Sequence, residues 1–390
     1  MPAERDNVNR SAFKKRIFEY RMRVAATAVF AIVAVLVVIF IIWRGYETKV
    51  YTTYTVVNAV ERIDVEGTKV LGFGSQFITY SADGIHCTDS KGRDVWSFPY
   101  QMQSPAVKVS GEYAVCSDYN GQSIYIFNSE GVCGTIQTNS PVKSAQISET
   151  GVVAAVIDKG SVTPVNLYYY DGSQIAGFRT TMSKSGYPVA IGISSDSKLV
   201  GVSYLYLDSG KLTSKVAFYN FGEVGQNETD NLVSGYDYQD EIIPEIRFLS
   251  DRKAFALGSS KLMFYEGSER PVNIANILIN EEVRAVYSGD NRVGLVFFNT
   301  TEEGKYRLDV YTSDGNLENS FYFDLDYSDI FFANDRVVIY NSTSALIYTA
   351  SGRLKFSGEF EEPVSLVLPT SSAVSYILVT PENIETISLQ

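Results

Sequence analysis

The sequence of 390 residues has one histidine and three cysteines. With His86 alone, it cannot form a zinc site with two or three histidines or an H-E-x-x-H motif. The phosphate-binding motif G-x-x-x-x-G-K-[ST] is absent, and Gly72-Phe-Gly74 is expected to be a turn between strands because no helix follows it. An odd number of cysteines does not make a disulfide framework, so we expect Cys87, Cys116 and Cys133 to be mainly free and buried, although one pair could form.

His86 and Cys87 are adjacent, which raises the question of a Cys–His dyad. They fall in an expected strand, Gly84–Thr88, where neighbouring side chains point to opposite faces. The two groups are therefore not expected to hydrogen-bond, and no catalytic, cofactor-binding or metal-binding residue is assigned.

Helical periodicity is also missing after Ala59. The sequence instead has short alternating runs rich in Val, Ile, Tyr and Phe; in Tyr306–Tyr311, for example, apolar and polar residues alternate. The 27 tyrosines suit half-buried strands better than helices. These features predict an all-β domain.

One long apolar run precedes that domain. Residues 24–43 contain no charge, and Thr27 is their only polar side chain. A helix of this length would be roughly 30 Å long, the thickness of a bilayer's hydrocarbon core. The run is longer than the core of a cleaved signal peptide, and no small-residue cleavage site follows it. We expect an uncleaved transmembrane helix between a basic head, residues 1–23, and a tether, residues 44–55.

Charge divides unevenly around this run. Residues 1–49 hold nine basic and four acidic residues, which leaves 24 basic and 41 acidic residues in the rest of the chain, a net charge of −17. The positive-inside rule predicts a single-pass plasma-membrane protein with a cytoplasmic N-terminus and an extracellular C-terminal domain. Such an acidic domain is not expected to bind nucleic acid or anionic lipid.

A glycine turn of similar form recurs along the domain. Its members are Gly92, Gly131, Gly172, Gly222, Gly267, Gly315 and Gly352. A spacing near 40 to 50 residues filled by short strands is typical of a β-propeller, and each turn would join the third and fourth strands of a blade with glycine at positive φ. The expected blades are 67–100, 104–138, 141–181, 187–237, 241–277, 282–324 and 327–360.

Residues 363–389 hold three further strand-like runs, one short of a blade, and residues 56–64 hold an unassigned one. Pairing them completes an eighth blade and removes exposed sheet edges. The predicted fold is therefore an eight-bladed β-propeller of residues 56–390, with seven blades as the alternative.

The turn from Asp89 to Trp96, DSKGRDVW, resembles the docking motif of quinoprotein-like and WD40-like propellers, with one residue fewer before the glycine. The resemblance implies that Trp96 packs between blades; later turns place Phe178, Phe321 or Phe356 nearby. The metal-binding and acid/base residues of quinone enzymes are not found, so no cofactor is expected. The layout of the whole chain resembles uncharacterised single-span proteins of Gram-positive, mainly clostridial, bacteria, which implies a cell-surface protein.

Two longer connections are candidate partner-contact loops, because exposed tyrosine beside aspartate suits a protein or a glycan. The first, residues 220–239, contains Tyr236, Asp237 and Tyr238; the second, residues 324–329, contains Asp324, Asp326 and Tyr327. Other polar groups are expected to be structural: Asp240-Glu241 and Glu361-Glu362 as solvated blade junctions, and Ser117–Gln122 as a turn.

The expected function is a non-catalytic binding or scaffolding module at the cell envelope. Its expected partner is an envelope or membrane protein, with a cell-wall glycan as another candidate. The alternative is a surface carbohydrate hydrolase that uses paired carboxylates in the propeller channel, which convergence of such pairs there would favour.

Overall fold

The computed structural model describes residues 20–23, 26–27, 29–40, 49–62, 68–181 and 185–390. The chain forms two units, Met1–Val50 and Tyr51–Gln390. In the first unit, residues 20–23, 26–27 and 29–40 are helical. None of the helices among the described residues is both long enough and apolar enough to span a bilayer. The predicted span 24–43 includes residues 24–25, 28 and 41–43, which lie outside the described part, as do residues 1–19 of the head.

The second unit is built from eight four-stranded antiparallel sheets, which confirms the eight-bladed propeller. Seven of these blades each use four consecutive strands. Blade 1 holds β2 (Lys69–Phe73), β3 (Gln76–Tyr80), β4 (Gly84–Asp89) and β5 (Asp94–Pro99). Blade 2 holds β6 (Pro105–Ser110), β7 (Tyr113–Asp118), β8 (Ser123–Asn128) and β9 (Gly131–Gln137). Blade 3 holds β10 (Val142–Ile147), β11 (Val153–Ile157), β12 (Val162–Tyr168) and β13 (Gln174–Thr181).

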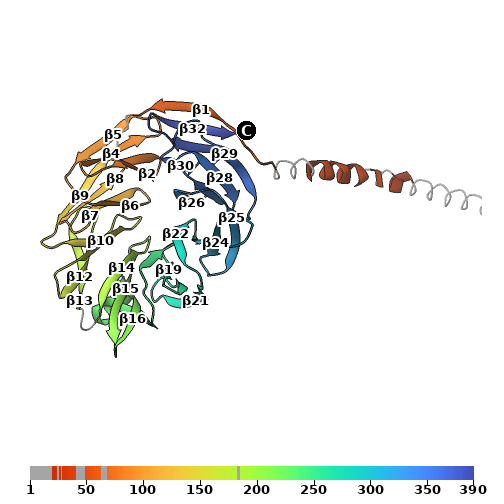
Figure 1. The fold of residues 1–390 in the computed structure, drawn as a ribbon. Coiled ribbons are helices and arrows are strands. Elements are labelled where there is room, and N and C mark those ends of the chain that lie inside the picture. Colours follow the sequence, from red (N-terminus) through yellow and green to blue (C-terminus); the bar gives the residue numbers. More distant parts are fainter. Residues whose placement is uncertain (1–19, 24–25, 28, 41–48, 63–67, 182–184) are drawn as a thin grey trace, which may run out of the picture. The chain divides into compact units, whose positions relative to one another are not determined.

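The next four blades continue in order around the ring (Figure 1). Blade 4 holds β14 (Tyr187–Ile193), β15 (Leu199–Asp208), β16 (Lys211–Asn220) and β17 (Leu232–Gln239), with the short helices α2 (Glu223–Gln226) and η1 (Thr229–Asn231) between the last two. Blade 5 holds β18 (Glu245–Phe248), β19 (Lys253–Leu257), β20 (Lys261–Glu266) and β21 (Val272–Leu278). Blade 6 holds β22 (Val283–Gly289), β23 (Arg292–Phe298), β24 (Tyr306–Thr312) and β25 (Leu317–Phe323). Blade 7 holds β26 (Asp329–Ala333), β27 (Arg336–Tyr340), β28 (Ser344–Thr349) and β29 (Leu354–Glu359).

Blade 8 closes the ring with strands from both ends of the domain. Its strands are β30 (Leu366–Pro369), β31 (Ser375–Val379), β32 (Asn383–Leu389) and, outermost, β1 (Tyr54–Glu61). Figure 1 shows β1 beside β32, and the register runs from Tyr54 opposite Leu389 to Glu61 opposite Asn383. The pairing predicted between the first and last strands is therefore present.

The segment before β1 is also held on the ring. Tyr51 is buried and forms a parallel bridge with Phe356 in β29, and its backbone N–H donates to the carbonyl oxygen of Lys355 at 2.8 Å. Thr53 accepts a hydrogen bond from the backbone N–H of Gln390 at 2.8 Å. Residues 51–55, which the sequence analysis placed in the tether, thus belong structurally to the closing blade and its neighbour.

The core is divided among the blade junctions. Eight clusters of buried apolar side chains each join one blade to the next, including one between blade 8 and blade 1. Trp96 on β5 stacks on Phe127 of blade 2, with ring centroids 5.1 Å apart and planes 6° from parallel. The inter-blade packing implied by the quinoprotein-like turn is therefore observed. Phe178 on β13 stacks in the same way on Tyr219 of blade 4, at 3.9 Å.

All seven predicted glycine turns join third and fourth strands. Six of the glycines have positive φ, but Gly222 has φ −82° because it caps α2 at the start of a longer connection. A Cβ on Gly172 would lie 2.8 Å from the carbonyl oxygen of Thr135, so close docking on the preceding blade also requires glycine there.

A bulge shifts the register where the third strand pairs with the beginning of the fourth, in all eight blades. Bulges on outermost strands disturb the free edge and so oppose unwanted pairing. We name the third-strand residue beside each bulge, on the turn side, the key position. In blades 2 to 8 it holds a large side chain packed into the junction with the preceding blade: Phe127, Tyr168, Tyr219, Tyr265, Tyr311, Tyr348 and Ile387. In blade 1 it holds Thr88.

Candidate functional site

The first candidate contact loop, residues 220–239, was predicted wrongly, because its second half is a strand. Its tyrosines lie on β17, the outer strand of blade 4, and only residues 221–231 connect the strands. Tyr238 is half-buried with its hydroxyl oxygen 2.7 Å from that of Tyr265, and Tyr236 donates to the carbonyl oxygen of Pro271 at 3.0 Å. Burial raises the pKa of Tyr238. Only Asp237 is exposed, and it accepts a hydrogen bond from Tyr206 at 3.0 Å. Alternation along a strand, not an irregular loop, explains the Tyr-Asp-Tyr pattern.

The second candidate loop, residues 324–328 between β25 and β26, does gather a cluster at the surface, in which Tyr306 and Tyr327 are half-buried. Tyr327 packs edge-on against Tyr306, with ring centroids 5.2 Å apart. Tyr306 in turn stacks on Phe298 at 5.6 Å, and Phe298 is 45% exposed. The guanidinium carbon of Arg284 lies 4.3 Å from the centre of the Phe298 ring. We name this row of Arg284, Phe298, Lys305, Tyr306, Asp326 and Tyr327 the aromatic ledge.

Charged groups fix the ledge in place. The Lys305 ammonium pairs with Asp326 and lies 5.1 Å from the centre of the Tyr306 ring. The Tyr306 hydroxyl donates to Asp326 at 2.9 Å, and the backbone N–H of Lys305 donates to Asp324 at 2.9 Å. The hydrogen bond from Lys305, together with that from Tyr306, holds the pKa of Asp326 below its usual range. All three predicted residues of this loop are therefore part of this arrangement. Asp324 and Asp326 hold Lys305 and Tyr306, and Tyr327 packs against Tyr306.

Sequence reasoning missed the other half of the ledge. Arg284 lies on the innermost strand of blade 6, and Phe298 and Tyr306 flank the loop between β23 and β24. The signal was present in the run Phe297-Phe298 and in Lys305-Tyr306, two aromatic groups at the ends of one hairpin loop. Their meeting with loop 324–328 depends on the register of three strands, which sequence patterning did not resolve.

Carboxylates on the innermost strands are few. Across the described first strands of the blades they are Glu245 on β18 and Asp329 on β26, with blade 6 between them. The Glu245 carboxylate is paired with Arg247, whose Nε–H donates a hydrogen bond to it at 2.6 Å. Burial raises the pKa of Asp329.

Another carboxylate departs from expectation. Glu241, expected to be solvated, is 1% exposed. It accepts hydrogen bonds from the Ser259 hydroxyl at 2.8 Å and from the backbone N–H of Ser260 at 3.1 Å, and it pairs with Lys261 at 3.3 Å. The expectation was wrong because the connection from blade 4 folds inward onto the loop between β19 and β20. Asp240 beside it is exposed, as expected.

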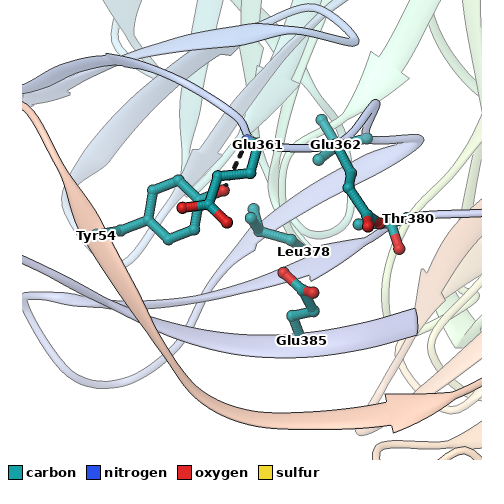
Figure 2. Close-up of a pocket in the computed structure, with 7 residues that line it drawn as sticks. Tyr54, Glu361, Glu362, Leu378, Thr380 and Glu385 are labelled. Atoms are coloured by element: carbon teal, nitrogen blue, oxygen red, sulfur yellow. Dashed lines mark hydrogen bonds between the residues drawn. The ribbon is translucent and has the colours of Figure 1, made fainter. Parts of the chain in front are cut away.

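Three carboxylates meet beside the closing blade. Figure 2 shows Glu361, Glu362 and Glu385 around a small pocket, with Tyr54 on one side. The pocket has a volume of about 50 Å³, and the Tyr54 hydroxyl accepts the backbone N–H of Glu361 at 3.0 Å. Burial raises the pKa of Glu385, and Glu362 and Glu361 add to the effect. This space is enough for one or two waters, not for a sugar ring.

Within the described part of the chain, no group of three or more His, Cys, Asp or Glu side chains is arranged to hold a metal ion. The cysteines are free, and burial raises the pKa of Cys87 to about 12. The Cys87 thiol donates to Gln76 at 3.2 Å, while the Nε2 atom of His86 lies 2.9 Å from an oxygen of Asp94. The two side chains thus have separate partners on opposite faces of β4.

Comparison with known proteins shows the family of this chain. A family model described as a family of unknown function, DUF5711, matches residues 47–389. The chain belongs to this family. No curated protein matches the sequence.

Solved structures share the fold of this DUF5711 domain. A crystal structure of BamB from Moraxella catarrhalis has a TM-score of 0.51 and 9% identity, covering 86% of this chain and 100% of that one. A crystal structure of a eukaryotic initiation factor has a TM-score of 0.50 and 13% identity, covering 88% of this chain and 87% of the other. At these identities the likeness shows the β-propeller fold alone.

Proposed function

We propose that this DUF5711 protein is a membrane-anchored scaffold. Residues 24–43 hold it in the plasma membrane, the propeller lies outside the cell, and the ring binds an envelope or membrane protein without catalysis. The uncharged run and the excess of lysine and arginine before it support the anchor and its orientation.

The observation that carries the binding role is the aromatic ledge. Protein-binding surfaces are enriched in aromatic residues and arginine, and their energetic centres are rigid side chains that a partner can desolvate. Phe298 fits this description, since it is 45% exposed yet held between Arg284 and Tyr306. On the described innermost strands the carboxylates are Glu245 and Asp329, which stand on different blades. Arg247 pairs with Glu245, which favours binding over hydrolysis.

A photo-crosslinking amino acid in place of Phe298 is expected to capture one specific protein in intact membranes. The matched control carries the same group in place of Val132, which is 43% exposed on the outer strand of blade 2. The variant Phe298→Ala should weaken the captured complex about tenfold or more, because truncating such an anchor costs roughly 2 kcal/mol or more. Capture of the same proteins from both positions, or of none from position 298, would contradict the proposal.

The orientation has a separate test. A cysteine placed at the exposed Asn227 should react with a membrane-impermeant thiol reagent in whole cells, and a cysteine at Ser11 should react only after the cells are opened. Both variants are made in a chain that also carries Cys133→Ser. Its remaining native cysteines, Cys87 and Cys116, are buried and should not react. Labelling of Ser11→Cys in intact cells would reverse the proposed topology.

A further inference from the structure

The outermost strand of blade 5, β21, differs in composition from the outermost strands of the other blades. Each of the other seven contains a glycine, a proline or a charged residue: Asp94 and Pro99 in β5, Gly134 in β9, Arg179 in β13, Asp237 in β17, Glu318 in β25, Lys355 in β29 and Glu61 in β1. Such residues weaken an edge strand or oppose its pairing with another chain. The sequence of β21, VNIANIL, has none of them.

One face of β21 is also apolar and exposed. Val272, Ile274 and Leu278 are 54%, 38% and 68% exposed. The opposite face is covered, because Ala275 and Ile277 pack into the junction with blade 6. β21 forms the outer edge of its sheet (Figure 1), and within the described part of the chain β20 is the only strand that pairs with it.

The first half of β21 is not available as an edge. The backbone N–H of Asn273 donates to the hydroxyl of Tyr236 on blade 4 at 3.2 Å. A bulge at Ile274 then shifts the register with β20. A bulge bends the strand and disturbs its pairing, so an additional strand could add only beyond this point.

The second half of β21 is regular and free. From Ala275 the register with β20 is unbroken, and the backbone N–H of Ile279 donates to the carbonyl oxygen of Ser260 at 2.8 Å. Bonded and non-bonded positions alternate in an antiparallel ladder, so the N–H and C=O groups of Asn276 and Leu278 point away from β20. These four groups have no hydrogen-bond partner among the described residues. They are an unpaired template for one more strand.

We propose that the edge at Asn276 and Leu278 binds an extended segment of a partner protein, which adds to blade 5 as a fifth strand. In this mode of recognition the backbone hydrogen bonds supply affinity, and the side chains beside the edge select the segment. Because Leu278 is largely exposed, an apolar side chain next to it on the added strand would cover it. The segment therefore carries apolar residues at alternate positions.

Charge narrows the choice of partner. Glu269 before β21 and Glu281 and Glu282 after it are exposed, and Arg270 is already paired with Glu228. A segment with lysine or arginine at its ends complements these carboxylates. A second copy of this chain fits less well, because two domains of net charge −17 repel each other. The site is independent of the aromatic ledge, so the two proposals can fail separately.

The test uses the full chain in detergent with short fluorescent peptides. One series alternates valine, isoleucine or tyrosine with threonine and carries lysines at both ends, and the matched series carries glutamates there. Fluorescence anisotropy should show that the lysine series binds at least tenfold more tightly than the glutamate series. Hydrogen–deuterium exchange at the amides of Asn276 and Leu278 should slow when a peptide binds, because strand pairing covers these groups.

The variant Asn276→Pro tests the backbone directly. Proline removes an N–H that points away from β20, so the blade keeps its own hydrogen bonds, and edge strands tolerate proline. Peptide binding should fall tenfold or more. The matched control Asn276→Ala loses the side-chain contacts with Asn273 but keeps the N–H, so it should bind as wild type does. The two variants should unfold within a few degrees of each other.

A charge on the edge gives a second comparison. Leu278→Lys should weaken binding of the lysine series several-fold, whereas Leu317→Lys, on the outermost strand of blade 6, should not. The proposal is overturned if the lysine series does not bind, if binding survives Asn276→Pro, or if binding leaves the two amides unprotected. Dimers of the full chain that Asn276→Pro abolishes would show that the edge pairs with a second copy, and the proposed partner would be wrong.

Discussion

A chain that ends at Glu382 is expected to lose its cooperative unfolding transition. It lacks β32, which pairs with β31 on one side and β1 on the other, so β1 keeps no partner in its blade. Ile384, Ile387 and Leu389 are at most 4% exposed, and each contributes about 1.5–3 kcal/mol on burial. Their loss, roughly 5–9 kcal/mol together, approaches the whole stability of a typical domain, about 5–15 kcal/mol.

Thermal unfolding followed by circular dichroism, with limited proteolysis around β1, measures this effect. The control is a chain that lacks only Gln390, whose backbone makes two hydrogen bonds with Thr53 and whose side chain makes one with Thr55, but which adds no strand pairing. That chain should melt within a few degrees of the full protein. If the longer truncation melted as the full chain does, blade 8 would not be holding the ring closed.

The second large effect is expected at Glu241. Its removal in Glu241→Ala leaves the Ser259 hydroxyl, the backbone N–H of Ser260 and the Lys261 ammonium without their acceptor. Ser259 is exposed and Lys261 is 31% exposed, so water replaces part of the lost acceptor and the expected cost is about 1–3 kcal/mol. Denaturant unfolding should report this loss as a lower midpoint with an unchanged slope.

The effect of Glu241 also depends on pH. Burial alone would raise its pKa, but hydrogen bonds from Ser260, Ser259 and Lys261 outweigh burial and lower it. A lowered pKa means that the stabilisation is present above the unfolded value of about 4.3 and is lost as the pH falls through the folded value. Glu241→Gln should therefore be less stable than wild type at pH 7 and approach it below about pH 4. The exposed control Glu130→Gln should follow wild type; a constant deficit for Glu241→Gln at every pH would contradict the assigned charge.

Most of the fold could be predicted because its signals are local. The turn glycines, such as Gly172 and Gly315, mark a conformation that few other residues adopt, and their spacing counts seven of the eight blades. The strand-like runs at both ends could be paired only because an open ring leaves two free edges. That argument relied on topology and needed no detail of side chains.

The candidate site could be predicted only in part, because packing between strands is not local. Tyr236 and Tyr327 both stand beside an aspartate, yet the first lies on a strand and the second on a rim loop. Glu241 looked solvated from its neighbours in sequence, whereas its partners come from the loop between β19 and β20. The key position can be located in the sequence, because Phe127, Tyr311 and Tyr348 each stand four residues before a turn glycine. Thr88 stands out only when that register is compared blade by blade.

Because the chain is synthesised from its N-terminus, β1 is made long before β32, the strand with which it pairs. β1 ends at Glu61 and β32 begins at Asn383, so the 321 residues 62–382 must be made between them. At about 5–20 residues per second, β1 waits roughly 16–64 s for its partner. During that interval its apolar segment around Val56 and Val57, which has no charge before Glu61, has no native strand to pair with. Until β32 is made, this segment is free to pair with another strand, so shielding it during synthesis is expected to raise the yield of folded protein.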